Sequence, residues 1–167
     1  MKKTAFILIP ILLLLLANIS ACTGYKPIFS SSNFNFKIED YSLKGEERLA
    51  NSIYKKIYNS TLSNKDNPAV QSISLSIEIN KEKKATIKNN AGKILEYEIT
   101  LNTKIIINDF LTEKLLLNQN LNYSTSYKVQ DEHSETVKLE NKNLENLVDR
   151  TYQEILIKIS ETIVKQW

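Results

Sequence analysis

The two side chains best suited to covalent or acid–base chemistry, a cysteine thiol and a histidine imidazole, each occur once in the chain. They are Cys22 and His133. A thiol becomes a nucleophile beside a base, pairs with a second thiol in a disulfide, or is modified covalently. Because there is no second cysteine, an intrachain disulfide is excluded. The residues around Cys22 and His133 therefore decide what each can do.

Cys22 ends an apolar N-terminal run. Lys2 and Lys3 precede a hydrophobic stretch from about Ala5 to Ala17, which is the pattern of a secretory signal peptide. The tetrapeptide Ile19-Ser20-Ala21-Cys22 resembles the bacterial lipobox. In a lipobox the thiol receives a diacylglycerol, the signal is removed, and the cysteine becomes the first mature residue. We therefore expect residues 1–21 to be a cleaved signal peptide and Cys22 to carry acyl chains, palmitate included.

Two other interpretations of this run are open. A membrane-spanning helix needs roughly 20 apolar residues, and this run is shorter and is interrupted by Pro10, Asn18 and Ser20. An ordinary cleaved signal with an incidental cysteine would leave a lone thiol in an oxidising compartment. The lipoprotein interpretation explains the cysteine directly.

His133 lies in the string Gln130-Asp131-Glu132-His133-Ser134-Glu135. It falls in a polar stretch that we expect to be a solvated connection, whereas catalysis requires a rigidly positioned group. One histidine among scattered acids does not have the ligand spacing of a metal site, and no glycine-rich phosphate loop is present. We expect no enzyme activity, no metal and no cofactor.

One basic cluster lies between two predicted strands. It contains Lys81, Lys83, Lys84 and Lys88, interrupted by Glu82. One interpretation is a solvated hairpin end whose charges protect the sheet edges from association. The other is a site for an anionic ligand such as a lipid headgroup, which clustered ammonium groups attract.

Removing the signal changes the charge of the chain. Loss of Lys2 and Lys3, without any acidic residue, lowers the formal net charge from +3 to +1. A nucleic-acid partner is therefore not implied. The remaining length suits one domain with one core. We expect residues 22–32 to form a lipidated tether and residues 33–167 a single domain.

Six segments of that domain show the periodicity of regular structure. Strict apolar–polar alternation predicts strands, and apolar spacing of three or four predicts helices. The predicted order is β-α-β-β-β-α: a strand over 33–41, a helix through Leu49, Ile53 and Ile57, strands over 72–79, 95–107 and 115–129, and a helix from Leu144 to Ile163. Because each strand has one polar face, helices are expected on one side only. We predict an α+β fold, a two-layer sandwich of two helices on a mostly antiparallel four-stranded sheet.

Three features together resemble one lipoprotein family. The segment Cys22-Thr23-Gly24-Tyr25-Lys26-Pro27-Ile28-Phe29 is similar to the start of LptE proteins, with Thr23 inserted after the cysteine. The element order matches, and Asn90–Tyr97 resembles the Gly-centred approach to the family's long strand. The resemblance implies a non-enzymatic outer-membrane lipoprotein on the periplasmic face. It would plug and help assemble the LptD β-barrel, with lipopolysaccharide as a second partner and Lys83, Lys84 and Lys88 as candidate contacts by location.

Two other functions are open. One is a lipid-anchored periplasmic accessory of another lipid-transport complex, of the ABC type. The other is an anchored hydrolase, for which the sequence offers no catalytic set. Thr23 follows the lipidated cysteine where Asp favours inner-membrane retention in enteric-type bacteria, and this favours the outer membrane.

Overall fold

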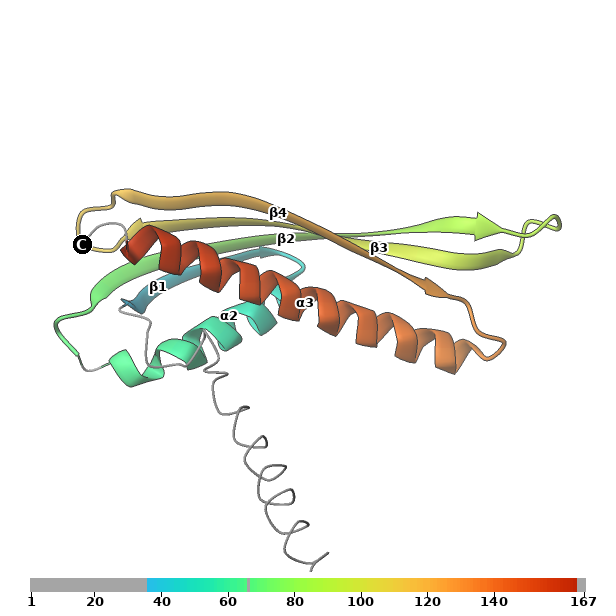
Figure 1. The fold of residues 1–167 in the computed structure, drawn as a ribbon, viewed down its shortest axis with the longest axis horizontal. Helices are drawn as coiled ribbons and strands as arrows, with labels where there is room; N and C mark the ends of the chain where they lie inside the picture. Colours follow the sequence, from blue (N-terminus) through green and yellow to red (C-terminus); the bar gives the residue numbers. More distant parts are fainter. Residues whose placement is uncertain (1–35, 66, 165–167) are drawn as a thin grey trace, which may run out of the picture. The chain divides into compact units, whose positions relative to one another are not determined.

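The computed structural model describes residues 36–65 and 67–164 (Figure 1). None of the helices in these ranges has both the length and the apolar character needed to span a membrane. The order of elements confirms the predicted β-α-β-β-β-α sequence. These are β1 (Phe36–Gly45), α2 (Glu47–Thr61), the short 3-10 helix η3 (Leu62–Asn64), β2 (Gln71–Lys88), β3 (Ile94–Asp109), β4 (Leu115–Lys128) and α3 (His133–Val164).

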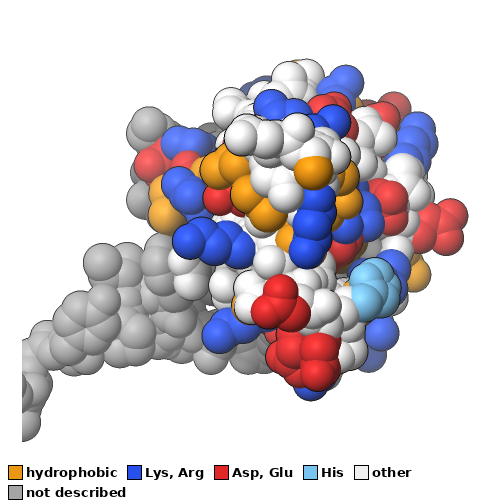
Figure 2. Space-filling view, turned by 90° about the vertical axis from the view of Figure 1, so that its right-hand side faces the viewer, with side chains coloured by type: hydrophobic (Ala, Val, Ile, Leu, Met, Phe, Trp, Pro, Cys, Tyr) orange, Lys and Arg blue, Asp and Glu red, His pale blue; other side chains and the backbone are white. Residues whose placement is uncertain are grey.

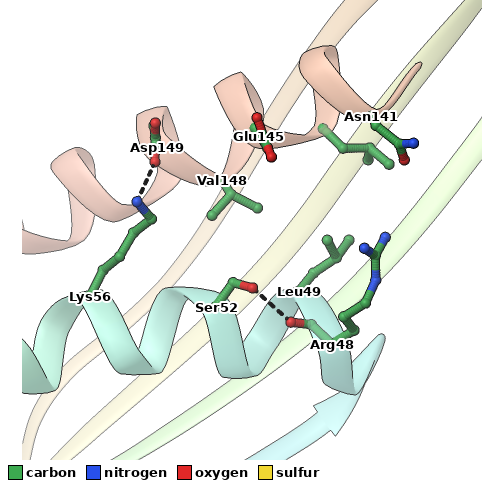
Figure 3. A pocket seen from close by; sticks show the side chains of 9 residues that line it. Arg48, Leu49, Ser52, Lys56, Asn141, Glu145, Val148 and Asp149 are labelled. Carbon is green, nitrogen blue, oxygen red and sulfur yellow. Dashed lines mark hydrogen bonds and ion pairs between the residues drawn. The ribbon is translucent and has the colours of Figure 1, made fainter. Parts of the chain in front are cut away.

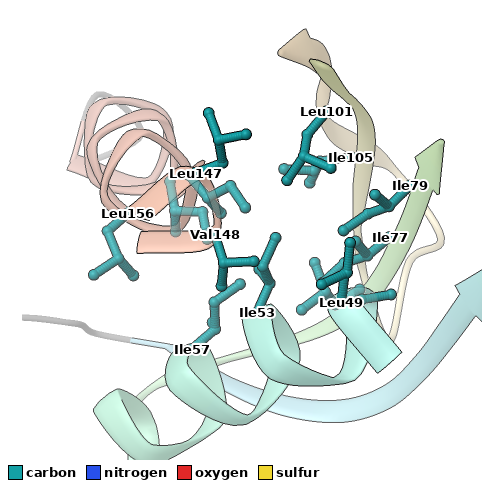
Figure 4. Packing of buried hydrophobic residues seen from close by; sticks show 14 of the residues in the cluster. Leu49, Ile53, Ile57, Ile77, Ile79, Leu101, Ile105, Leu147, Val148 and Leu156 are labelled. Carbon is teal, nitrogen blue, oxygen red and sulfur yellow. The ribbon is translucent and has the colours of Figure 1, made fainter. Parts of the chain in front are cut away.

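The four strands form one sheet in the order β1-β2-β3-β4. β1 pairs with β2 in parallel, from Phe36 opposite Gln71 to Gly45 opposite Ile79. The other two pairs are antiparallel. A parallel pair needs a crossover connection, and α2 supplies it. Both helices lie on the same side of the sheet, as Figures 1 and 4 show. The predicted two-layer α+β fold is confirmed.

The core lies between this inner face of the sheet and the two helices. Ile53 and Ile57 of α2 are fully buried against the sheet and against Leu147 and Val148 of α3 (Figure 4). Alternation along β2 and β3 places their apolar side chains on the same face. The sheet contributes Ile73, Leu75, Ile77, Ile79, Ile99, Leu101, Ile105 and Ile107 to this core.

Gly45 makes the sharp junction between β1 and α2 possible. Its φ of +76° lies in the left-handed region that glycine adopts without steric cost. A Cβ there would lie 2.1 Å from the carbonyl oxygen of Ile79. The same oxygen accepts a hydrogen bond from the backbone N–H of Glu46 at 2.8 Å. The close approach therefore connects the start of α2 to β2.

β1 ends at Gly45, four residues later than predicted, and two other predicted boundaries are wrong by nine residues or more. Apolar alternation predicted that the second strand ends at Ile79, but β2 continues to Lys88 and pairs with β3 as far as Ile94. The lysine cluster therefore lies within a strand and not in a connection. Backbone hydrogen bonds hold an antiparallel pair without an apolar face, so the loss of apolar alternation after Ile79 did not mark the end of the strand.

The final helix also begins earlier than predicted. α3 starts at His133, so the predicted polar connection over 130–141 is largely helical. Its first turns expose charged side chains. The side of these turns that faces the sheet carries Thr136, which is buried, and Leu139 and Glu140, which are half-buried. The stripe predicted further along is confirmed where it is described, with Leu144, Leu147, Val148, Ile155 and Ile159 buried.

The turn between β3 and β4 is organised by one carboxylate. Asp109 Oδ1 accepts hydrogen bonds from the backbone N–H groups of Leu111 and Thr112 at 3.1 and 2.8 Å, and from Thr112 Oγ1 at 2.8 Å. Its Oδ2 accepts one from Gln71 Nε2 at 2.9 Å. The bond from Gln71, followed by those from Thr112, lowers the pKa of Asp109 from 3.8 to about 2.

Candidate functional site

The predicted lipid-attachment residue Cys22, the tether and the Gly24–Phe29 motif lie outside the described residues. The candidate contacts for an anionic ligand lie within them. Lys83, Lys84 and Lys88 all belong to the C-terminal half of β2, which leads to the turn at Asn89–Lys93. Their positions on this strand decide what each ammonium group can reach.

Lys83 is the centre of a polar cluster on the inner face of the sheet. Its ammonium Nζ lies 2.5 Å from Glu140 Oε2 on α3 and 4.3 Å from the centre of the Tyr97 ring on β3. Tyr127 of β4 donates a hydrogen bond from its hydroxyl to the same Glu140 oxygen at 2.8 Å. We call Lys83, Tyr97, Tyr127 and Glu140 the Lys83 cluster. It joins one side chain from each of β2, β3, β4 and α3.

The electrostatics of the Lys83 cluster favour the charged pair. Burial alone would raise the pKa of Glu140, but hydrogen bonds from Lys83 and Tyr127 and the charges of Lys83 and Lys81 outweigh burial and lower it. Burial likewise opposes the charge of Lys83, yet its bonds to Glu140 and Tyr127 raise its pKa. Burial raises the pKa of the Tyr127 phenol. At neutral pH Glu140 is therefore a carboxylate and Lys83 an ammonium.

The structure does not bring the three predicted lysines together. Adjacent residues of a strand point to opposite faces, and Lys84 lies on the outer face, 3.0 Å from Glu98 Oε1. Its side chain is 73% exposed, against 34% for Lys83. Lys88 follows a shift in register after Ala85 and is exposed near the turn. Lys83 is thus engaged internally, while Lys84 and Lys88 face solvent.

Figure 2 looks onto this end of the sheet and shows cationic, acidic and apolar side chains interleaved. Ile87 and Leu95 are among its exposed apolar residues, at 48% and 40%. Charged and apolar side chains are therefore both exposed at this end of the sheet.

The outer face of the sheet is dominated by small uncharged polar side chains. The amide Nδ2 of Asn122 donates a hydrogen bond to Asn102 Oδ1. Asn102 in turn donates from its Nδ2 to Glu82 Oε1 at 3.3 Å. This amide chain crosses β4, β3 and β2. A shallow hollow of 440 Å³ lies around it, lined by Glu78, Asn80, Asn102, Thr103, Lys104, Asn120, Leu121 and Asn122. The predicted polar face of Asn118, Asn120 and Asn122 is exposed as expected.

A larger groove of 580 Å³ lies between α2 and α3 (Figure 3). Its floor is apolar, with Leu49 and Val148 almost fully buried. Across it, Lys56 Nζ of α2 lies 2.9 Å from Asp149 Oδ1 of α3. Its one serine, Ser52, donates its hydroxyl hydrogen to the backbone carbonyl of Arg48 at 2.9 Å. The groove thus holds helices together and places no base beside its hydroxyl.

His133 is not part of a catalytic or metal-binding arrangement within the described ranges. It is the exposed first residue of α3, so its predicted place in a connection was wrong and its predicted exposure was right. Among the described residues, no three His, Cys, Asp or Glu side chains are grouped to hold a metal. Arg150 places its guanidinium 4.3 Å from the centre of the Tyr123 ring, which makes it a cation–π contact between α3 and β4.

Sequence reasoning missed Glu140, the residue that completes the Lys83 cluster. A signal was available, because Thr136, Glu140, Leu144 and Val148 are spaced four apart and extend the apolar stripe of α3 backward. Glu140 interrupted the apolar pattern and was therefore assigned to a connection. Tyr97 is half-buried and Tyr127 is buried, so both ring systems lie on the core side of the sheet.

Comparison with known proteins finds the fold but no sequence family. No family model and no curated protein matches the chain. Among solved structures, the chain is similar to a chain described as a candidate lipoprotein from Caulobacter crescentus, with a TM-score of 0.58 and 9% identity over 80% of this chain and 93% of that one. It is also similar to the rare lipoprotein B from Shewanella oneidensis, with a TM-score of 0.56 and 14% identity over 76% and 98%.

A third structure, lipoprotein B from Nitrosomonas europaea, matches with a TM-score of 0.50 and 12% identity over 86% of this chain and 93% of that one. At these identities the likeness concerns the fold. The chain therefore has the α+β fold of these lipoprotein structures, and the similarity extends over nearly the whole length of each of them.

Proposed function

We propose that this chain is a lipid-anchored lipoprotein of the LptE kind, which serves as plug and assembly partner of an LptD-type β-barrel in lipopolysaccharide transport. It acts without catalysis, on the periplasmic side of the outer membrane. One observation carries the proposal: the same chain has a cysteine in a lipobox-like segment, Cys22, and a fold similar to that of rare lipoprotein B.

The outer sheet face supports the plug role. A plug must fit a barrel lumen whose wall is polar and hydrated. The face offers the exposed amides of Asn118, Asn120 and Asn122 and the half-buried hydroxyls of Ser72, Ser74 and Ser76. Such short polar side chains lose little conformational entropy when a partner covers them.

The β2–β3 hairpin end supports contact with lipopolysaccharide. In this proposal Lys84 and Lys88 meet the phosphates directly, because both are exposed near the turn. Lys83 is within reach of the same ligand but is bound by Glu140. Surface ammonium groups attract phosphate without needing a bidentate geometry.

Co-purification tests the partner. A tagged full chain is extracted from membranes in mild detergent, and its partners are identified and quantified. The expected result is an LptD-type β-barrel in equal amount, with a triacylated Cys22 at the mature N-terminus by mass spectrometry. Recovery alone, or with an inner-membrane ATPase complex, would overturn the plug role.

Binding of purified lipopolysaccharide tests the ligand. The double variant K84E/K88E should weaken binding by about tenfold or more, since it reverses two charges at the hairpin end. The matched control, K104E/K114E, also reverses two exposed charges, one in the hollow of the outer face and one beside the β3–β4 turn. Equal losses in both variants would show a general effect of net charge and would refute a site at the hairpin.

A further inference from the structure

One end of the sheet carries large apolar side chains that the fold leaves in water. At the turn between β3 and β4, Phe110 is 42% exposed, Leu111 is 82% exposed and Leu115 is 54% exposed. Leucine is mostly buried in folded proteins. These three residues, two in the turn and one at the start of β4, form an apolar tip, which we call the Leu111 tip (Phe110, Leu111 and Leu115).

The Leu111 tip is held in its exposed shape. The Asp109 carboxylate accepts hydrogen bonds from Leu111 N, Thr112 N and Thr112 Oγ1, as described above. Phe110 N donates to Ser72 O at 2.9 Å, and Asp109 N donates to Lys114 O at 2.9 Å. The hydrogen bonds that keep the apolar residues outward are therefore those of the turn itself, and the tip needs no rearrangement to present them.

The Leu111 tip lies where the chain enters the domain. Phe36, the first residue of β1, is opposite Gln71, and Gln71 Nε2 donates to Asp109 Oδ2 at 2.9 Å. The start of β1 and the turn are thus two strands apart at the same end of the sheet (Figure 1). The segment from Cys22 to Phe36 spans at most about 50 Å when fully extended. A lipid on Cys22 therefore limits the distance between the membrane and this end of the domain to at most about 50 Å.

We propose that the Leu111 tip inserts into the lipid leaflet that holds the anchor and orients the domain with this end toward the membrane. The inference rests on the proposed lipidation of Cys22. Phenylalanine and leucine are residues that amphipathic anchors place at the boundary of headgroups and acyl chains. The tether keeps the local concentration of membrane near the tip high, so that a few apolar side chains are sufficient for a lasting contact.

A lipid surface fits this tip better than a protein partner. The tip is a short turn and not a groove or a broad face, and a specific protein interface usually takes about 800 Å² from each partner. The opposite end of the sheet provides an internal contrast, because apolar and charged side chains are interleaved there (Figure 2). Among the described residues, three exposed large apolar side chains within six consecutive positions occur only at this turn.

The test places a fluorescent reporter on the tip of the full lipoprotein. Leu111→Cys is labelled with an environment-sensitive nitrobenzoxadiazole group, which is selective because acylation consumes Cys22. The exposure of Leu111 makes the substitution tolerable for folding. The control is Asn90→Cys in the β2–β3 turn at the opposite end. Both proteins are reconstituted in vesicles of phosphatidylethanolamine and phosphatidylglycerol, with and without lipids that carry a spin-label quencher in the acyl chain.

We expect a blue-shifted emission at position 111 that the quencher lowers by at least twofold, and a water-like, unquenched emission at position 90. Water-like emission at 111 on an acylated protein would overturn the inference and leave the proposed function standing. A blue shift without lipid quenching would place the tip against protein and would overturn it too. Equal quenching at both positions would contradict the proposed orientation. An unmodified Cys22 by mass spectrometry would instead overturn the anchor, and the inference with it.

Discussion

Both halves of the inner face of the sheet hold a helix against the strands, but through different interactions. In the half under α2, fully buried Ile53, Ile57 and Ile77 form an apolar core. In the half toward the β2–β3 turn, the Lys83 cluster holds the first turns of α3 to three strands. Apolar burial is non-directional and tolerant of geometry. A partly buried ion pair depends on geometry and protonation. The difference indicates that the second half contributes less stability and more sensitivity to its surroundings.

The largest effect should come from the apolar half. Ile53→Ala removes a fully buried side chain at the centre of the layer and should lower the free energy of unfolding by about 2–5 kcal/mol. Urea denaturation followed by circular dichroism measures the change. Leu62→Ala is the control, because that leucine is 47% exposed. Similar losses in the two variants would show that the apolar half is not the main source of stability.

A second large effect is expected at the junction of β1 and α2. Gly45→Ala places a Cβ against the carbonyl oxygen of Ile79 and demands a left-handed φ from alanine. The left-handed φ alone should lower the free energy of unfolding of the alanine variant by roughly 1–3 kcal/mol. Gly92→Ala is a matched control, since Gly92 also has a positive φ, of +80°, but its Cβ would meet nothing within 4 Å. If the two variants lose equal stability, the close approach at Gly45 contributes nothing beyond the backbone angle.

A smaller effect is expected in the polar half. A double-mutant cycle of Lys83→Met and Glu140→Gln should give a coupling free energy of about 0.5–1 kcal/mol, because the pair is partly exposed and solvent screens it. The cycle of Lys84→Met and Glu98→Gln on the outer face should give about half as much, since the Lys84 side chain is 73% exposed. A larger coupling on the outer face would reverse the proposed ranking.

The smallest expected effect is on how the free energy of unfolding depends on pH. The polar half should contribute to this dependence and the apolar half should not. The pKa of Glu140 is lowered in the folded state, so its carboxylate stabilises the fold above the ordinary value of 4.5, and this stabilisation is lost as pH falls through the folded pKa. Glu140→Gln should reduce the slope of the free energy of unfolding against pH in that window. Ile53→Ala should leave the slope unchanged. The same slope in wild type and in Glu140→Gln would show that Glu140 does not carry it.

Asp109 offers a second titration in a lower range. Its pKa falls from 3.8 to about 2, so its stabilising bonds are present above pH 3.8 and are lost between about pH 4 and 2. Asp109→Asn should remove this part of the acid sensitivity. Carboxyl titration by NMR measures both groups directly, and an Asp109 midpoint near 3.8 would contradict the hydrogen-bonded turn.

The fold was predictable where burial and periodicity coincide. Ile73 to Ile79 alternate in sequence because one face of β2 is buried, and Leu49, Ile53 and Ile57 repeat every four residues because one face of α2 is buried. The Lys83 cluster broke this correspondence. Its members face the core side but are polar, so β2 was predicted to end before Lys83 and the last helix to begin after Glu140. Lys83 pairs with Glu140, which lies three elements further along the chain. The periodicity of β2 alone does not indicate so distant a partner.

The Leu111 tip was missed for a related reason. Phe110 and Leu111 sit between strands, where the sequence indicated only that Asn108-Asp109 begins a turn. Their exposure depends on the hydrogen bonds that Asp109 receives from Gln71 and Thr112. The contact with Gln71 joins segments 38 residues apart, so it became evident only with the strand register.

The parallel pairing of β1 with β2 has a mechanical consequence. β1 is the edge strand that would follow the proposed tether, and its pairing runs from Phe36 opposite Gln71 to Gly45 opposite Ile79. A pull on Phe36 directed along the strand strains all the hydrogen bonds of this pair at once, in shear. Unzipping, in which bonds break one after another, would require a pull across the strand. If a tether pulls on the start of β1 along the strand, all the hydrogen bonds of the β1–β2 pair resist that force together. The force would then be transmitted to the domain without detaching its edge strand.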